Sequence, residues 1–430
     1  MSGLLGVIAL LVLLTLGVPI GVAMGVVGLV GLTMMLGFEP ALIKSGIVLF
    51  ETVLRYELGV LPLFLLMAHI CFAAGASRDF FDAAARLIGH RRGGLALASI
   101  AGCAGFGAIS GSSLATAATI GLVGLPEMRR RGYSDALATG SVAVGGTLGS
   151  LIPPSGALIV FGILAEVSIG KLFTAAIIPA LSQALFYMIT IVLLCQWKPS
   201  LGPATEKASW SERRAALLRV TDLAILVTLV MGGIALGWFT PTEAASVGAV
   251  GALLLCARRR KLSWNSLREA LAETLRTTGM IYVVIIGALI FSVFMSLTGL
   301  ADQVATLMEG LGGGQLTAVI VMTILLLLLG SVLDGLALML LTTPILLPII
   351  VQLGLSPVWF GIYLVRTMEL GFVHPPIGIN LYVIQGIAKD VPLTRIFKGV
   401  LPFLAADFVH LALLIAVPGL ALALPMWLGS

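Results

Sequence analysis

Long stretches without a single Asp, Glu, Lys or Arg dominate this sequence. They cover residues 1–38, 93–126, 136–165, 172–197, 223–242, 277–301, 310–333, 335–365 and 408–430. A helix needs about 20 apolar residues to cross the hydrocarbon core of a bilayer, so each stretch is long enough to cross or fill it. The pattern therefore predicts an all-α, polytopic membrane protein.

Composition supports this class. The chain has 430 residues, of which 59% are hydrophobic and only 10% charged, against about 25% charged in a soluble domain. Its four cysteines lie in or at the end of apolar runs without a CxxC spacing, so we expect packing residues rather than disulfides or metal ligands. The net charge of +5 has a topological explanation, given below, and does not indicate nucleic-acid binding.

One segment occurs twice in the chain. Leu148–Gly156 reads LGSLIPPSG, and Leu370–Gly378 reads LGFVHPPIG. The shift that brings Leu148 onto Leu370, called the repeat offset below, aligns further positions without a gap: Pro19 with Pro241, Ser112 with Asp334, Gly132 with Gly354 and Ser134 with Ser356. These matches in register predict that the chain is two copies of one unit.

Both copies have the same order of elements. The first copy, residues 1–199, is predicted to hold scaffold helices over 3–76, a re-entrant hairpin over 93–126, a broken span over 134–166 and a returning span over 171–197. After a cytoplasmic linker over 200–219, the second copy, 220–430, is predicted to hold scaffold helices over 220–298, a hairpin over 315–350, a broken span over 356–388 and a last span over 399–428. This makes about ten transmembrane helices, two re-entrant hairpins and two broken helices.

An odd number of crossings in each copy would invert the second copy relative to the first. The segments assigned to one side are 78–92, 127–135, 198–219, 258–276 and 389–398, and they carry 21 of the 25 Lys and Arg residues. The opposite side carries three. Because basic loops stay in the cytoplasm, both termini are predicted to be periplasmic, in a bacterial inner membrane.

The hairpin tips and helix breaks are the candidate functional site. A break inside the bilayer leaves backbone groups that only protein, ions or water can satisfy. Carbonyl oxygens there can coordinate Na⁺, and helix N-termini suit an anionic substrate. We predict one Na⁺ site in each copy, where tip meets break. The first would use Ser110, Gly111, Ser112, Ser113, Gly149, Pro153, Pro154 and Gly156; the second would use Asp334, Gly335, Gly371, Pro375, Pro376 and Gly378.

Some of these residues have a second interpretation. Asp334 lies within a hairpin otherwise free of charge, where an ionised carboxylate is costly unless paired. A cation ligand is favoured on that ground, and a helix N-cap is the alternative. The tip serines fit ligands, caps or interhelical hydrogen bonds equally well.

Substrate contacts are assigned to four residues, Ser112, Ser155, Arg366 and Asn380. Arg366 and Glu369 lie three apart on one helical face. A mutually satisfied ion pair and a substrate contact therefore both fit Arg366.

Several of these motifs together resemble one transporter family. The PTEAA stretch at Pro241–Ala245, the Ser-Gly-Ser-Ser tip and the breaks LIPPSG and ELGFVHPPIGINLYV look like the large (M-type) membrane subunit of tripartite ATP-independent periplasmic (TRAP) transporters. The resemblance covers nearly the whole chain.

The resemblance implies Na⁺-driven uptake of organic acids, such as C4-dicarboxylates or sialic acid, by an elevator-like movement. It also implies a periplasmic substrate-binding protein and a small four-helix membrane subunit. No extra helices precede Met1, so the small subunit is expected to be a separate chain. No cofactor beyond the coupling Na⁺ is expected.

Other function classes fit less well. There is no Walker A motif, so ATP hydrolysis is not expected, and no comparable nucleophile motif predicts an enzyme. The main rival is a sodium- or proton-coupled anion symporter of the wider ion-transporter superfamily that works alone, without a binding protein. A structural or receptor role is the third class, and it predicts that Asp334 can be changed without loss of transport.

Overall fold

The protein is helical throughout the part of the chain that the structure describes. A computed structural model describes residues 2–310, 314–331, 333–375 and 377–429, and these ranges contain no strand. Within them, seven helical segments are long and apolar enough to cross a membrane, and five shorter apolar helices accompany them. The predicted all-α, polytopic class is confirmed, whereas the number of crossings stays a prediction.

The first half contains α1 (Ser2–Thr15), α2 (Ile20–Leu36), α3 (Phe38–Leu54), the 3₁₀ turn η1 (Tyr56–Gly59), α4 (Val60–Ala73), α5 (Ala76–Ile88), α6 (Gly94–Ser110), α7 (Ser113–Arg130), α8 (Asp135–Leu151), α9 (Gly156–Ala165), α10 (Ile169–Trp197) and the 3₁₀ turn η2 (Pro199–Leu201). The second half contains α11 (Trp210–Ala235), α12 (Pro241–Arg258), α13 (Trp264–Thr298), α14 (Leu300–Gly310), α15 (Gly314–Gly330), α16 (Gly335–Gln352), α17 (Pro357–Gly371), α18 (Ile379–Ile387), α19 (Leu393–Ala416) and α20 (Gly419–Leu428).

The helix boundaries follow the repeat offset seen in the sequence. Shifting α7 by this offset gives the bounds of α16, and α8 shifted in the same way begins where α17 begins. The pairs α6–α7 and α15–α16 occupy the segments predicted as hairpins, and α8–α9 and α17–α18 occupy those predicted as broken spans. The opposite orientation of the two halves stays a prediction.

Two segments differ from the sequence expectation. The linker is shorter than 200–219, because α11 begins at Trp210, where Ser209 and Glu212 form a capping box. A capping box can start a helix within polar sequence. The helix α11 therefore begins before the apolar run that the sequence analysis used to locate it.

The last span, predicted over 399–428, is also divided. Helix α19 ends at Ala416, and α20 begins after Pro418. Proline lacks an amide proton and pushes the preceding residue out of the helical region. Val417 accordingly has φ −127° and ψ 77°.

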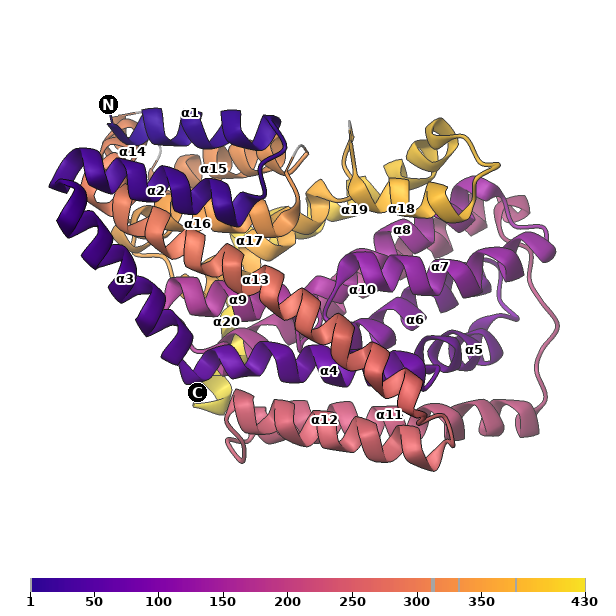
Figure 1. The fold of residues 1–430 in the computed structure, drawn as a ribbon. Helices are drawn as coiled ribbons and strands as arrows, with labels where there is room; N and C mark the ends of the chain where they lie inside the picture. The colour runs from indigo at the N-terminus through magenta and orange to yellow at the C-terminus, as the bar shows by residue number, and fades with distance from the viewer. Residues whose placement is uncertain (1, 311–313, 332, 376, 430) are drawn as a thin grey trace.

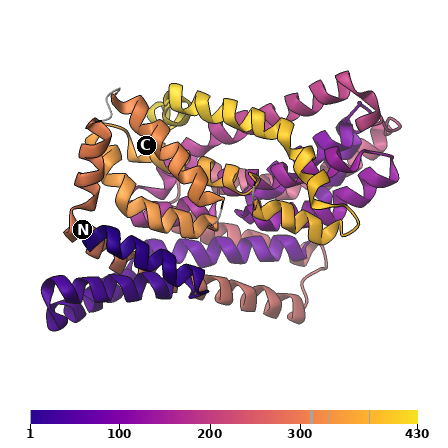
Figure 2. The same ribbon diagram turned by 90° about the horizontal axis from the view of Figure 1, so that it is seen from above.

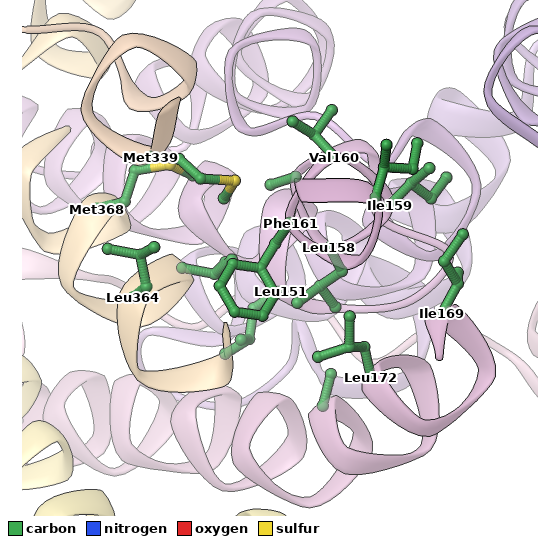
Figure 3. Packing of buried hydrophobic residues seen from close by; sticks show 14 of the residues in the cluster. Leu151, Leu158, Ile159, Val160, Phe161, Ile169, Leu172, Met339, Leu364 and Met368 are labelled. Atoms are coloured by element: carbon green, nitrogen blue, oxygen red, sulfur yellow. The ribbon is translucent and has the colours of Figure 1, made fainter. Parts of the chain in front are cut away.

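The broken spans form the centre of the molecule. Every residue from Leu137 to Leu151 of α8 and from Trp359 to Gly371 of α17 is buried. Phe161 of α9 packs edge-on against Phe360 of α17, with ring centroids 5.8 Å apart, and Figure 3 shows it close to the side chains of this core. The two broken spans, one from each half, therefore share one core.

The remaining helices are arranged around this core. Figure 1 shows the long helix α13 running diagonally across the front, with α11 and α12 along the lower edge and both chain ends on the left of the view. The loop from α10 to α11 lies at the far right. Seen from above in Figure 2, the indigo N-terminal helices lie along one edge of the molecule, and the yellow C-terminal end lies along the opposite edge.

Helices α2 and α13 cross through glycines. A Cβ atom on Gly287 of α13 would lie 2.0 Å from the carbonyl oxygen of Gly21 in α2. A Cβ on Gly28 would likewise lie 2.8 Å from the backbone nitrogen of Phe291. Small residues let transmembrane helices approach this closely, so α2 and α13 pack backbone against backbone.

We expect Gly287→Ala to lower the melting temperature, because the added methyl group meets backbone that cannot move aside. Overpacking of this kind costs about 1–3 kcal/mol. The matched control is Gly279→Ala in the same helix, where no atom of the described residues lies within 4 Å of the added atom and the better helix propensity of alanine gains up to about 1 kcal/mol. Equal melting temperatures for the two variants would contradict the close crossing.

Candidate functional site

A cavity lies where the two hairpin tips face helices α4 and α13. Its volume is about 560 Å³, and its wall includes Ser110–Ser113 of the first tip and Asp334 of the second. Helix α13 contributes Thr277 and Met280. Figure 3 labels three further residues of the wall, Ile159, Val160 and Met368, on α9 and α17. The cavity is thus lined by both halves of the chain.

Within the described ranges, five helices begin at this cavity. The first residues of α2, α7, α9, α16 and α18 all line it: Ile20, Ser113, Gly156, Gly335 and Ile379. The free amide groups at a helix N-terminus carry a partial positive charge and form a ready-made site for an anion. Five such ends around one cavity favour a negatively charged ligand.

The first tip is hydrogen-bonded to the first break. The Oγ atoms of Ser113 and Ser150 lie 2.7 Å apart, and the Ser113 hydroxyl also lies within donating distance, 3.2 Å, of the carbonyl oxygen of Thr147. The Gly156 amide donates to the Gly111 carbonyl at 3.3 Å. The structure therefore brings this tip and this break together, as the sequence predicts.

Two glycines make this approach possible. Gly111 has φ +59°, and a Cβ there would lie 2.8 Å from the carbonyl oxygen of Pro154. A Cβ on Gly149 would lie 2.5 Å from the carbonyl oxygen of Ser112. Of the residues predicted for the first cation site, those that line the cavity are Ser110, Gly111, Ser112, Ser113, Pro154 and Gly156, whereas Gly149 and Pro153 are buried without lining it.

Asp334 differs from the expectation in its exposure. The sequence argument assumed a buried carboxylate, but Asp334 is exposed on the cavity wall. Its Oδ1 accepts a hydrogen bond of 3.0 Å from the Ala337 amide, which makes it the N-cap of α16. The cost of burial therefore does not apply here. Asp334 is therefore the helix N-cap that was the alternative interpretation, and it also lines the cavity.

The second tip packs against the second break through backbone. A Cβ on Gly371 would lie 2.8 Å from the carbonyl oxygen of Gly330, and a Cβ on Gly335 would meet Met368 and Phe372. Of the residues predicted for this site, Asp334 and Gly335 line the cavity, Gly371, Pro375 and Gly378 lie outside its lining, and Pro376 falls outside the described residues.

The four predicted substrate contacts all belong to the described ranges, and among them only Ser112 reaches the cavity. It lines the wall and caps α7. Ser155 is buried, caps α9 and donates to the carbonyl of Ser150. Asn380 is buried and donates from Nδ2 to the carbonyl of Ala143 at 3.1 Å. The side chains of Ser155 and Asn380 therefore make hydrogen bonds inside the core and do not face the cavity.

Arg366 lies in a buried polar cluster between helices. Its guanidinium group pairs with Asp407 of α19 and donates from Nε to His410 Nδ1 at 3.3 Å. Glu369, the partner expected from the sequence, is further away, at 3.9 Å. The structure thus gives Arg366 an internal partner that the sequence analysis missed. The available signal was a single acidic residue in the apolar span 399–428, because such a residue requires a partner.

The cavity offers oxygen atoms as ligands. They come from hydroxyl groups, backbone carbonyls and the Asp334 carboxylate. Within the described ranges, His, Cys, Asp and Glu side chains do not gather in groups of three that could hold a metal ion. Hydroxyl, carbonyl and carboxylate oxygens suit hard cations rather than soft transition metals.

Comparison with known proteins identifies the family. The family model described as the tripartite ATP-independent periplasmic transporter, DctM component, matches residues 7–420. A C4-dicarboxylate TRAP transporter large permease protein of Pseudomonas aeruginosa is 36% identical over 404 residues, covering 94% of both chains. A sialic acid TRAP transporter large permease protein of Vibrio cholerae is 32% identical over 377 residues, covering 87% of this chain and 88% of the relative.

Two further similarities concern architecture. An isethionate TRAP transporter permease protein, DctMQ, of Oleidesulfovibrio alaskensis is 34% identical over 425 residues, covering 97% of this chain but 65% of the relative. The crystal structure of the YdaH transporter of Alcanivorax borkumensis matches with a TM-score of 0.60 and 14% identity, covering 91% of this chain and 89% of that one. At that identity the match concerns the fold alone. Because the family model matches nearly the whole length and the permease relatives are 36% and 32% identical, the chain belongs to the large permease subunits of TRAP transporters, which are secondary transporters and not enzymes.

Proposed function

We propose that the chain is the permease of a Na⁺-coupled uptake system for a small organic acid that a periplasmic substrate-binding protein delivers. The observation that carries this proposal is the convergence of five helix N-termini and the Asp334 carboxylate on one cavity within the described residues. The relatives are named for C4-dicarboxylates, sialic acid, 2,3-diketo-L-gulonate and isethionate. All four are organic anions, which fits a cavity surrounded by positive helix ends.

The Asp334 carboxylate gives a physical reason for coupling to a cation. An anion entering the cavity meets this negative charge on the wall, and like charges at short range repel each other. A Na⁺ ion held by Asp334 removes the repulsion and adds attraction. The cation therefore promotes binding of the anion, and the anion promotes binding of the cation to the same extent.

The first tip supplies the first candidate Na⁺ site. The Ser113 hydroxyl lies 3.2 Å from the Thr147 carbonyl oxygen, and the Ser150 hydroxyl lies 2.7 Å from that of Ser113. These are neutral oxygen ligands close to the N-terminus of α7. A cation at this tip would hold the hairpin against the break.

The position of the cavity supports an elevator-type movement. Hairpins and broken spans supply one part of its lining, whereas α2, α4 and α13 supply the other. Helix α13 also packs against α2 through the glycine crossing at Gly287. In this proposal α2, α4 and α13 belong to a fixed scaffold, and the core of hairpins and broken spans carries ion and substrate past it.

The remaining partners are proposed from the family. A small four-helix membrane subunit is the proposed partner within the membrane, and helix α3 offers it an apolar surface. Phe38, Phe50 and Leu54 of α3 are each 66% exposed. The fused DctMQ relative, of which this chain covers 65%, agrees with a two-part membrane assembly. We place the assembly in the inner membrane with both termini of this chain in the periplasm.

Sodium binding can be tested without knowledge of the substrate. We expect NaCl to raise the melting temperature of the purified protein above that in choline chloride, since a ligand at 100 times its Kd stabilises the folded state by about 2.7 kcal/mol. Asp334→Asn should lose most of this shift. Asparagine caps a helix as well as aspartate does, so the melting temperature of the variant in choline chloride should stay near that of the wild type.

The exposed variant Glu51→Gln serves as the control for loss of one negative charge. If Asp334→Asn keeps the full Na⁺ shift, Asp334 is only a helix cap, and the assignment of the second cation site fails.

The need for partners separates this proposal from a symporter that works alone. In proteoliposomes with an inward Na⁺ gradient, we expect uptake of a radiolabelled C4-dicarboxylate or sialic acid only when the small subunit and the matching binding protein are both added. Uptake by this chain alone would establish the stand-alone symporter instead.

A further inference from the structure

Asp407 joins three helices at a single atom. Its Oδ1 accepts hydrogen bonds from Gln183 Nε2 at 2.6 Å and from the Tyr187 hydroxyl at 2.7 Å, and it pairs with Arg366. The donors come from α10 and α17, while Asp407 belongs to α19. All four side chains are completely buried. These four residues are absent from the lining of the cavity between the described helices, so binding of substrate there does not explain them.

The cluster continues to the first hairpin tip. The Tyr187 oxygen lies 3.2 Å from Thr147 Oγ1 on α8. Tyr187 has a single hydroxyl proton, which it donates to Asp407, so Thr147 is the donor of this second bond and shares its own proton with the Val144 carbonyl at 2.7 Å. The backbone carbonyl of the same Thr147 accepts from Ser113 Oγ at 3.2 Å. A series of hydrogen-bonded groups therefore runs from Arg366 to Ser113.

This series connects the two broken spans. Arg366 lies on α17 of the second broken span, and Thr147 lies on α8 of the first. A second bond between the same spans runs from Asn380 of α18 to the Ala143 carbonyl of α8. The repeat offset does not reproduce the connection, because it pairs Tyr187 with Val409 and Asp407 with Leu185. The cluster is thus a feature of the assembled protein and not of the repeated unit.

We propose that Asp407 and Tyr187 are positioning residues, which hold the second broken span in fixed register with the first and so set the geometry of the cation site at Ser113 and Thr147. The proposal rests on the Na⁺ coupling proposed above. Neither residue touches the ion. Each acts through Thr147, whose carbonyl would be a ligand.

The physics favours a stiff connection. A buried carboxylate with its charge partner in contact resists displacement, because separating the pair leaves both charges without compensation in a low-dielectric interior. Hydrogen-bond networks in such an interior also reinforce one another. A movement of α17 relative to α8 would therefore displace Thr147, because the hydrogen-bonded side chains between them move together.

Tyr187→Phe tests this role most cleanly. It removes one hydroxyl group, which breaks the connection between Asp407 and Thr147, but it leaves Asp407 paired with Arg366 and Gln183. The matched control is Tyr282→Phe, which removes a hydroxyl that donates to the Leu58 carbonyl at 2.9 Å, between α13 and η1. Each variant removes a single tyrosine hydroxyl that donates one hydrogen bond, and only the first lies in the proposed series, where it also accepts from Thr147.

The readout is the NaCl concentration that half-saturates the Na⁺ site, its apparent Kd, obtained by fitting the logarithmic rise of the melting temperature with NaCl concentration. We expect Tyr187→Phe to raise this concentration about fivefold, as for loss of one buried hydrogen bond, while Tyr282→Phe leaves it at the wild-type value. A purely structural role would lower the melting temperature in choline chloride and leave the half-saturating concentration unchanged, which would overturn the proposal.

Failure of the proposed function would look different. If the wild type shows no Na⁺ shift at all, the sodium coupling is wrong and this inference falls with it. If the wild type shows the shift and Tyr187→Phe matches it at every NaCl concentration, only the positioning role is overturned. Asp407→Asn serves as the second variant, and it should raise the half-saturating concentration at least as far as Tyr187→Phe does.

Discussion

The structure depends on how backbone groups are satisfied where helices stop inside an apolar environment. An unpaired amide or carbonyl costs several kcal/mol in hydrocarbon, so a break there requires partners close by. Here Ser112, Ser155 and Asp334 cap the helices that restart after a tip or break. The first tip and first break satisfy each other further through Gly111 and Gly156. The cavity exists because these ends face one another.

The same constraint gives the cavity its chemistry. Helices that restart at one place present their positive ends there, so α7, α9, α16 and α18 make an environment for an anion. Asp334 is an exposed acidic group on the wall of this cavity, and it opposes an anion unless a cation accompanies it. In the mechanism that we propose, capping and coupling are two consequences of one arrangement: the carboxylate that starts α16 would also bind the ion.

Much of this fold could be predicted because a membrane imposes simple patterns. Runs without charge located the helices, and the LGSLIPPSG and LGFVHPPIG segments located both breaks within a residue or two. The tip Ser110–Ser113 was found because polar residues in the middle of an apolar run need a reason. The start of α11 was missed because its first turns are polar, and the division at Pro418 was missed because the surrounding run is uniformly apolar.

Such patterns do not predict contacts between distant parts of the chain. Asp407 accepts hydrogen bonds from Gln183 and Tyr187, which lie 224 and 220 positions away in the chain. The exposure of Asp334 likewise depends on the cavity formed with α4 and α13, which a hairpin considered alone does not reveal.

We propose that both hairpin tips bind Na⁺ beside one shared cavity. The most direct test is a pair of high-resolution cryo-electron microscopy maps of the purified complex, one in NaCl and one in choline chloride. We expect additional density beside Asp334 and between Ser113 and Thr147 in NaCl only. Sodium-dependent density elsewhere, with both tips unchanged between the two maps, would contradict it.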